Sequence, residues 1–240
     1  MNIVITGAGS GIGFQAALIL SANSENYVFA ISRNKENLDQ LKAESIKQNP
    51  ASKLFVISGD ITDEQAIAKI TDEIKINCNM VHILINNAGL LITKPFESLT
   101  MLDWKNVYST NVFGTINMIR QLLPLLETAG SIEAKSHILN ISSIGGFQGS
   151  IKFKGLVAYS SAKAAMVSIT ECLAEEFKDR NIAVNCLCLG SVQTEMFSAA
   201  FPSMKASATV REMATYISTF AIEGQKYFNG KIIPVSNSTP

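Results

Sequence analysis

Short, nearly continuous apolar runs recur along the chain, and segments with helical spacing of apolar residues lie between them. The runs predict strands at Asn2–Thr6, Tyr27–Ser32, Lys53–Ser58, Val81–Asn86, His137–Ser142, Ile182–Leu189 and Lys231–Val235. The intervening segments predict helices near 11–23, 35–48, 63–77, 101–128, 157–179 and 208–222. Strands that lack polar alternation are typical of parallel sheets covered on both faces. The pattern therefore predicts an α/β fold with one doubly wound, seven-stranded, mostly parallel sheet and helices on both faces.

Length and composition fit one such domain. The chain has 240 residues, 47% of them hydrophobic, and shows no linker or repeat, so we expect a single domain over 1–240. Thr62-Asp63-Glu64-Gln65 has the pattern of a capping box that opens the third helix.

The charge balance argues against two classes of partner. Twenty basic and twenty acidic residues cancel, so no global field attracts nucleic acid or an anionic membrane. No apolar run reaches the roughly 18 residues that span a bilayer, and a strand at Asn2 leaves no room for a signal peptide. We expect a cytoplasmic protein without nucleic-acid or membrane partners.

The cysteines and histidines do not suggest a metal site. The four cysteines are Cys78, Cys172, Cys186 and Cys188, and none forms a metal-type cluster with His82 or His137. We expect buried free thiols, which suit a reducing compartment, and no bound metal.

A glycine-rich turn follows the first strand. Thr6-Gly7-Ala8-Gly9-Ser10-Gly11-Ile12-Gly13 joins that strand to the first helix. Glycines let the backbone approach a pyrophosphate, and the helix N-terminus offers free N–H groups, so the turn predicts a Rossmann-type dinucleotide site. A plain strand-to-helix turn is the structural alternative.

The end of the second strand bears on cofactor choice. An acid there binds the ribose 2′-hydroxyl of NAD, whereas an arginine accommodates the 2′-phosphate of NADP. The chain has Ser32-Arg33-Asn34 and no acid. A guanidinium binds phosphate through charge-assisted hydrogen bonds, so NADP(H) is favoured. Arg33 as an ordinary solvated charge is the alternative.

Tyr159 and Lys163 stand four residues apart in a predicted helix. This spacing places phenol and ammonium on one helix face, about a turn apart. A nearby ammonium favours the phenolate, so we expect the phenol to have a pKa below its free value of about 10. The pair predicts proton transfer beside a redox cofactor, although such pairs also occur on helices by chance.

Taken in order, these motifs resemble the short-chain dehydrogenase/reductase family, in its compact one-domain branch, over essentially the whole chain. The matching elements are Thr6-Gly7-x-x-x-Gly11-x-Gly13, Asp60, Asn86-Asn87-Ala88-Gly89, Asn111, Asn140-Ile141-Ser142-Ser143 and Tyr159-x-x-x-Lys163. The resemblance implies a catalytic tetrad of Asn111, Ser143, Tyr159 and Lys163. In that assignment Tyr159 exchanges the proton and Ser143 polarises the carbonyl. Lys163 holds the cofactor ribose hydroxyls and, together with the cationic oxidised nicotinamide, lowers the phenol pKa, and Asn111 anchors a water.

The same resemblance implies further cofactor contacts. Asp60 is expected at the adenine and Asn87 at its ribose, with Val192 at the nicotinamide amide and Thr194 near the phosphates. The full expected cofactor set is Gly7, Ser10, Gly11, Ile12, Gly13, Ser32, Arg33, Asn34, Asp60, Ile61, Asn87, Ala88, Gly89, Tyr159, Lys163, Gly190, Val192 and Thr194. Leu189 stands where the family usually has proline, the loop from Gly145 to Gly155 is long, and the insert from Glu195 to Ala208 predicts a small substrate lid.

The resemblance implies an NADP(H)-dependent oxidoreductase that interconverts a carbonyl and a secondary alcohol. The leading specific hypothesis is a reductase of 3-oxoacyl thioesters on acyl-carrier protein. Reduction of small diketones, pterins or sugar-like ketones is an alternative. A catalytically silent NADP-binding regulator is another, which the intact tetrad disfavours. The short C-terminal region disfavours an epimerase or dehydratase of the extended branch.

The resemblance also implies a homodimer or homotetramer that pairs the helices near 101–128 and 157–179. Nine residues of the first helix suggest more apolar surface than one sheet-covering face needs. They are Val107, Phe113, Ile116, Met118, Ile119, Leu122, Leu123, Leu125 and Leu126. Small residues also line one stripe of the second helix, either for packing within the subunit or for contact with a second copy. Coverage of the excess by the sheet and loops is the alternative to an oligomer.

Overall fold

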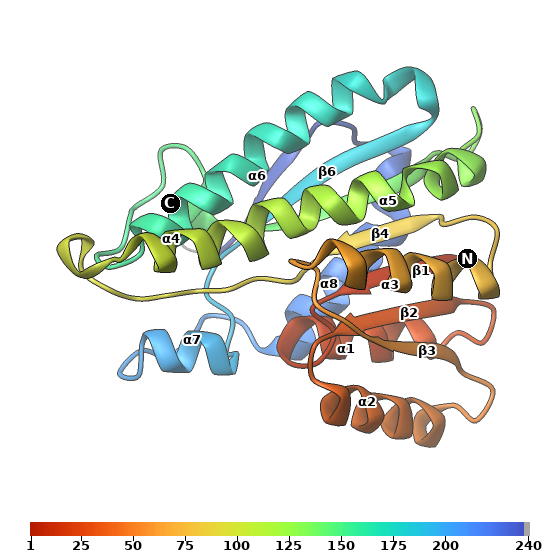
Figure 1. Cartoon of the computed structure of the whole chain (residues 1–240), viewed down its shortest axis with the longest axis horizontal. Helices are drawn as coiled ribbons and strands as arrows, with labels where there is room; N and C mark the ends of the chain where they lie inside the picture. The colour runs from red at the N-terminus through yellow and green to blue at the C-terminus, as the bar shows by residue number, and fades with distance from the viewer. Residues whose placement is uncertain (238–240) are drawn as a thin grey trace.

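The computed structural model describes residues 1–237 and contains one parallel sheet in the order β3-β2-β1-β4-β5-β6-β7 (Figure 1). Its strands are β1 Asn2–Thr6, β2 Tyr27–Ser32, β3 Lys53–Ser58, β4 Ile83–Asn86, β5 Ser136–Ser143, β6 Ile182–Leu189 and β7 Ile232–Val235. All six strand pairings that the structure describes are parallel. The predicted doubly wound, Rossmann-like fold is confirmed.

Eight α-helices connect the strands in the described part of the chain. They are α1 Gly11–Ser21, α2 Lys35–Gln48, α3 Glu64–Asn77, α4 Met101–Tyr108, α5 Gly114–Ala129, α6 Val157–Glu176, α7 Glu195–Ala200 and α8 Val210–Glu223. Short 3₁₀ turns are η1 Phe96–Ser98, η3 Ile144–Gly146, η4 Lys178–Arg180 and η5 Gly224–Lys226, and η2 Ser109–Phe113 is a π turn. One core packs α1, α2 and α8 on one sheet face, and a second packs α3, α5 and the end of α6 on the other (Figure 1).

The order in which successive strands join the sheet reverses at β1. β1 pairs with β2 on one side and with β4 on the other, so that Thr6 lies opposite both Ile31 and Asn86. The loops after these strands consequently leave the same edge of the sheet in opposite directions. In open α/β sheets the ligand site lies in the crevice outside the carboxyl ends of the strands at such a point. Helix α7 projects beyond the sheet in Figure 1.

The helix predicted near 101–128 is interrupted. α4 and α5 are joined by η2, which contains Asn111. The Asn111 amide donates to the carbonyl oxygen of Val107 in α4 and to that of Leu90, 2.8 Å in each case. Because Leu90 belongs to a distant loop, the interruption depends on a tertiary contact that periodicity does not reveal.

One local expectation was wrong and a second was right only in part. Helix α3 is capped by Asp63, whose carboxylate accepts from the backbone N–H groups of Gln65 and Ala66, so Thr62 does not open a capping box. All four thiols are free, but Cys172 is exposed and Cys78 is only half-buried, leaving Cys186 and Cys188 as the buried pair.

The apolar excess inferred for the helix near 101–128 is mostly absent. Side chains of α5 such as Met118, Leu122 and Leu126 are fully buried in the core against α3 and the sheet. Of the nine residues in that inference only Phe113 is largely exposed, at 56%. On α6, Ala158 and Ala162 pack with Val107 of α4 within the subunit. These residues therefore give no independent support for an oligomer.

Candidate active site

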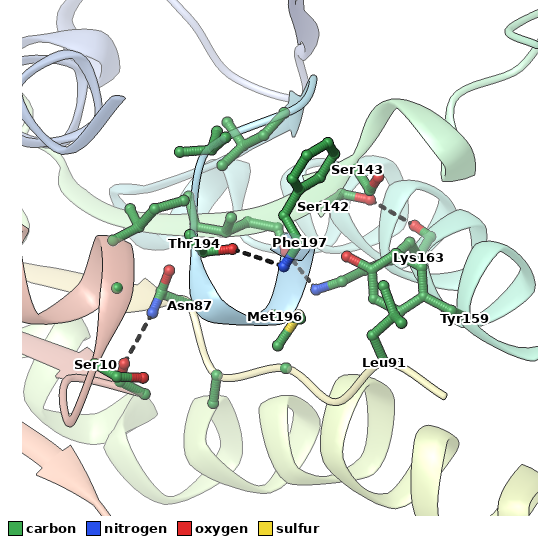
Figure 2. Close-up of a pocket in the computed structure, with 18 of the residues that line it drawn as sticks. Ser10, Asn87, Leu91, Ser142, Ser143, Tyr159, Lys163, Thr194, Met196 and Phe197 are labelled. Carbon is green, nitrogen blue, oxygen red and sulfur yellow. Dashed lines mark hydrogen bonds between the residues drawn. The ribbon is translucent and has the colours of Figure 1, made fainter. Parts of the chain in front are cut away.

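A cavity of about 630 Å³ opens at the carboxyl ends of the strands. The glycine turn, the ends of β2, β4, β5 and β6, the first half of α6 and the lid around α7 all contribute to its wall. Loops from both halves of the sheet thus meet in one space. Figure 2 shows Ser10 and Asn87 at one end of this pocket and Tyr159 and Lys163 toward the other.

The glycine turn brings bare backbone to the cavity. Gly7 and Gly11 have φ values of 70° and 55°, which side chains rarely adopt. A Cβ on Gly13 would lie 2.3 Å from the carbonyl oxygen of Gly7, so only glycine lets the first turn of α1 pack this closely. The Ser10 side chain makes no capping hydrogen bond to α1. The N-terminus of α1 therefore has no side-chain cap beside the cavity, which suits a phosphate.

Asn87 holds this turn in place. Its side-chain amide donates to the carbonyl oxygens of Thr6 and Gly7, 3.2 Å in each case. The Thr6 hydroxyl in turn accepts from the backbone N–H groups of Asn87 and Ala88. Asn87 also lines the cavity, and its NH₂ group is hydrogen-bonded to the end of β1 and to the glycine turn.

Arg33 and Asp60 face each other after β2 and β3. A guanidinium nitrogen of Arg33 lies 3.7 Å from a carboxylate oxygen of Asp60, and the Arg33 side chain is 68% exposed. The other Asp60 oxygen accepts from the backbone and hydroxyl of Thr62. Both residues line the cavity beside the glycine turn.

Ser143 and Tyr159 meet at the end of β5. Side chains alternate along a strand, and the two serines at the end of β5 make different contacts. The Ser142 hydroxyl donates to the Lys163 carbonyl oxygen at 2.8 Å, which fixes α6 on β5, while the Ser143 hydroxyl accepts from Gly145 N–H at 3.1 Å. The Ser143 hydroxyl also lies against the Tyr159 phenol.

Lys163 is 96% buried below Tyr159. Its ammonium donates to the Ile141 carbonyl oxygen at 2.9 Å and lies 5.8 Å from the centre of the Tyr159 ring. A Cβ on Gly89 would be 3.5 Å from Lys163 Nζ and 3.1 Å from Asn111 Oδ1. Because Gly89 has no side chain, both Lys163 and Asn111 can lie close to its backbone.

Burial controls the protonation of this pair. It raises the pKa of Tyr159 to about 12, against a smaller lowering by the Ser143 hydroxyl. It also lowers the pKa of Lys163 to about 8. The expectation of a phenol pKa below 10 is therefore wrong for the ligand-free protein, because burial removes the solvation that stabilises the phenolate. At neutral pH Tyr159 is a protonated phenol.

Most of the expected site residues line this cavity. They are Gly7, Ser10, Gly11, Ile12, Ser32, Arg33, Asp60, Ile61, Asn87, Ala88, Gly89, Ser143, Tyr159, Lys163, Gly190, Val192 and Thr194. Three others lie outside the lining. Gly13 is beneath the turn, Asn34 caps α2 by accepting from Asn37 N–H, and Asn111 is buried behind Gly89.

Sequence reasoning missed the apolar residues at the substrate end. The cavity is also lined by Leu91, Ile144, Phe153, Leu156, Met196, Phe197, Phe201 and Met204. They lie in loops and in the short helix α7, where apolar residues show no periodic pattern. In the sequence, only the lengths of the loop from Gly145 to Gly155 and of the insert from Glu195 to Ala208 indicated that these segments shape access to the cavity. Among residues 1–237 no cluster of His, Cys, Asp and Glu could hold a metal ion, and no helix is long and apolar enough for a membrane span.

Comparison with known proteins identifies relatives of the whole chain. The family model of the short chain dehydrogenase matches residues 1–205. The 3-oxoacyl-[acyl-carrier-protein] reductase FabG of Aquifex aeolicus is 27% identical over 247 residues, which cover 97% of this chain and 94% of that protein.

Solved structures share the fold. A complex of RhlG from Pseudomonas aeruginosa with NADP superposes with a TM-score of 0.88 at 24% identity, covering 99% of this chain and 95% of that one. A 3-ketoacyl-(acyl-carrier-protein) reductase from Brucella melitensis with NADH gives 0.83 at 23% identity, covering 98% and 96%.

Fold and site together define a nicotinamide-dependent oxidoreductase that acts on CH–OH groups. The chain belongs to the short-chain dehydrogenase family.

Proposed function

We propose that this protein is an NADP(H)-dependent enzyme that interconverts a carbonyl and a secondary alcohol. The observation that carries the proposal is the protonated Tyr159 phenol, with Ser143 and Lys163 beside it, in the same cavity as the glycine turn. When bound, the nicotinamide supplies hydride to a carbonyl carbon or accepts it from an alcohol.

The residues present fit a dinucleotide. The glycine turn and the N-terminus of α1, which lacks a side-chain cap, would hold the pyrophosphate. Val192 and Thr194 follow β6 on the cavity wall, where Val192 would lie at the nicotinamide amide and Thr194 near the phosphates. Asp60 would accept from the adenine amino group.

Side chains of this protein can supply the proton that the carbonyl oxygen takes up during reduction. In the reducing direction Tyr159 donates its phenolic proton to the carbonyl oxygen, and Ser143 holds that oxygen with a hydrogen bond. Lys163, with a pKa of about 8, can return a proton near neutral pH. Its ammonium also favours the phenolate as that form develops. Asn111 keeps Leu90 and Val107 in position beside this path, and we retain for it the expected role of anchoring a water.

NADP(H) is preferred over NAD(H) in this proposal. Arg33 is held at the cavity by Asp60 and keeps two-thirds of its side chain in solvent, so it can turn toward a 2′-phosphate. Ser32, Arg33 and Asn34 include no acid that would repel that phosphate. The structural relatives include complexes with NADP and with NADH, so this preference depends on Arg33.

The leading substrate candidate is a 3-oxoacyl thioester, as the name of the Aquifex aeolicus relative indicates for that protein. Small diketones, pterins and sugar-like ketones are the second candidate group. A silent NADP-binding regulator would need neither Tyr159 nor Ser143 in the cavity.

We also propose that the chain acts as one domain in a cytoplasmic homodimer or homotetramer. Exposed apolar side chains such as Phe96, Met101 and Leu102 lie at and before the start of α4, close to α6. Light scattering that finds only 25.9 kDa particles in a fully active sample would contradict the oligomer.

The activity is tested by mixing protein and NADPH with 3-oxoacyl thioesters, diketones, pterins and sugar ketones while NADPH absorbance is followed. We expect oxidation of NADPH that requires both protein and ketone. Tight NADPH binding without turnover on any member of the panel would instead support the silent regulator.

A further inference from the structure

Three phenylalanines from two distant segments meet at the mouth of the cavity. Phe153 belongs to the loop before α6, and Phe197 and Phe201 belong to α7 and its C-cap. The rings of Phe153 and Phe201 have centroids 5.7 Å apart at 62°, and those of Phe197 and Phe201 lie 5.3 Å apart at 41°. We call these three residues the aromatic clasp.

The lid, which carries two of the three clasp residues, is held at its base by hydrogen bonds. Val192 pairs with Ala208, and the Gln193 backbone N–H donates to the Ala208 carbonyl oxygen at 2.9 Å. The Gln193 side chain donates to the Ser198 hydroxyl at 2.9 Å and accepts from Ala206 N–H at 3.0 Å. The position of α7 over the cavity is therefore fixed by the protein itself.

The clasp is incompletely covered. Phe153 is 42% exposed, and Met196 and Met204 on the lid are 42% and 51% exposed. All of them line the same cavity as Tyr159, and Figure 2 shows Met196, Phe197 and Leu91 in the pocket with Tyr159 and Lys163. When a ligand covers apolar surface that was exposed to water inside the cavity, the free energy of the complex falls and binding becomes tighter.

The charges that line this end of the cavity disfavour an anionic tail. The charged residues in the described lining are Arg33 and Asp60 beside the glycine turn, Lys163 beneath Tyr159, and Glu195 on the lid. The lid therefore contributes a carboxylate and no cation to the wall. An anionic substituent would be repelled there, and a neutral hydrocarbon substituent is the best match.

We infer that the aromatic clasp selects ketones with a neutral alkyl chain beyond the reacting carbonyl, and that Phe153 contacts this chain. The inference rests on the proposed carbonyl reduction and deepens it by naming the substrate class. The alkyl chain of the substrate enters between the loop before α6 and the lid. Substrates with longer alkyl groups therefore bind more tightly than short or hydroxylated ones.

The test compares ethyl 3-oxobutanoate, ethyl 3-oxohexanoate and ethyl 3-oxooctanoate with NADPH, and measures kcat and KM. Each fully buried methylene contributes up to about four-fold in affinity, so we expect kcat/KM to rise several-fold per two-carbon step, mainly through KM. In Phe153→Ser this rise should shrink to within about two-fold per step, because part of the apolar contact is lost. Phe153→Leu should keep most of it.

Ile151→Ser is the matched control. Ile151 is in the same loop and is 66% exposed, but it does not line the cavity, so its variant should show the parental rise. Turnover of all three esters without dependence on chain length, or an equal flattening in Ile151→Ser, would overturn the aromatic clasp while leaving the carbonyl reductase intact. Reduction of a pterin or a sugar ketone but of none of the three esters would likewise overturn the aromatic clasp alone, whereas NADPH binding without reduction of any ketone in either panel would refute the reductase.

Discussion

Replacing Arg33 by Ala tests how the protein distinguishes NADPH from NADH. A hydrogen bond to a charged group contributes about 1.5–3 kcal/mol, or roughly 10- to 150-fold in affinity. The guanidinium of Arg33 is largely exposed and shares its charge with Asp60 at 3.7 Å. Solvent screening and this competition put the effect at the low end. We therefore expect the parent to bind NADPH about ten-fold more tightly than NADH.

In Arg33→Ala this preference should nearly vanish, with weaker NADPH binding and NADH affinity within about two-fold of the parent. Titration calorimetry or quenching of the single tryptophan, Trp104, can measure both affinities. Lys35→Ala removes the same charge two residues later, from an exposed position outside the cavity lining, and should change neither affinity by more than about two-fold. Equal affinities in the parent, or equal losses in Lys35→Ala, would refute a specific contact of Arg33 with the 2′-phosphate.

Two further predictions concern stability and the phosphate turn. Burial lowers the pKa of His137 from 6.5 to about 4, so folding loses stability as pH falls from about 6.5 to 4. In urea unfolding, His137 should contribute about 2 kcal/mol to the loss of unfolding free energy between about pH 7.5 and pH 5, and the loss in His137→Gln should be smaller by about that amount because only the weaker shift of His82 remains. An equal loss in both proteins contradicts this assignment. Gly13→Ala should bind NADPH at least about ten-fold more weakly, because its Cβ would lie 2.3 Å from Gly7 O and displace the turn. Unchanged NADPH affinity in Gly13→Ala would refute the role of this turn in binding the cofactor.

The strands and most helices could be predicted because their cause is local. Apolar runs such as Tyr27–Ser32 and Ile182–Leu189 coincide with β2 and β6 at both ends. The break at Ser109–Phe113 could not be predicted, since it depends on the contact of Asn111 with Leu90. Helix α7 was missed because six residues are too few for a periodic pattern.

The candidate site also has one part that the sequence predicts and another that only the three-dimensional structure reveals. Gly7, Tyr159 and Lys163 belong to motifs whose spacing is visible in the sequence, and all three line the cavity. The protonation of Tyr159 depends on burial that spacing does not report, and the expected direction of its pKa was wrong for the ligand-free protein. Phe153 and Phe201 are separated by 48 positions in irregular segments, so their contact becomes visible only in three dimensions.

The central claim is that Tyr159 transfers the proton in a carbonyl reduction, and Tyr159→Phe tests it most directly. With a ketone that the parent reduces, the variant should keep NADPH affinity but lose about 10²- to 10⁴-fold in kcat, the usual contribution of general acid catalysis. Tyr216→Phe removes a hydroxyl from an exposed position on α8 and should leave kcat unchanged. A Tyr159→Phe variant with kcat within a few-fold of the parent would contradict the account.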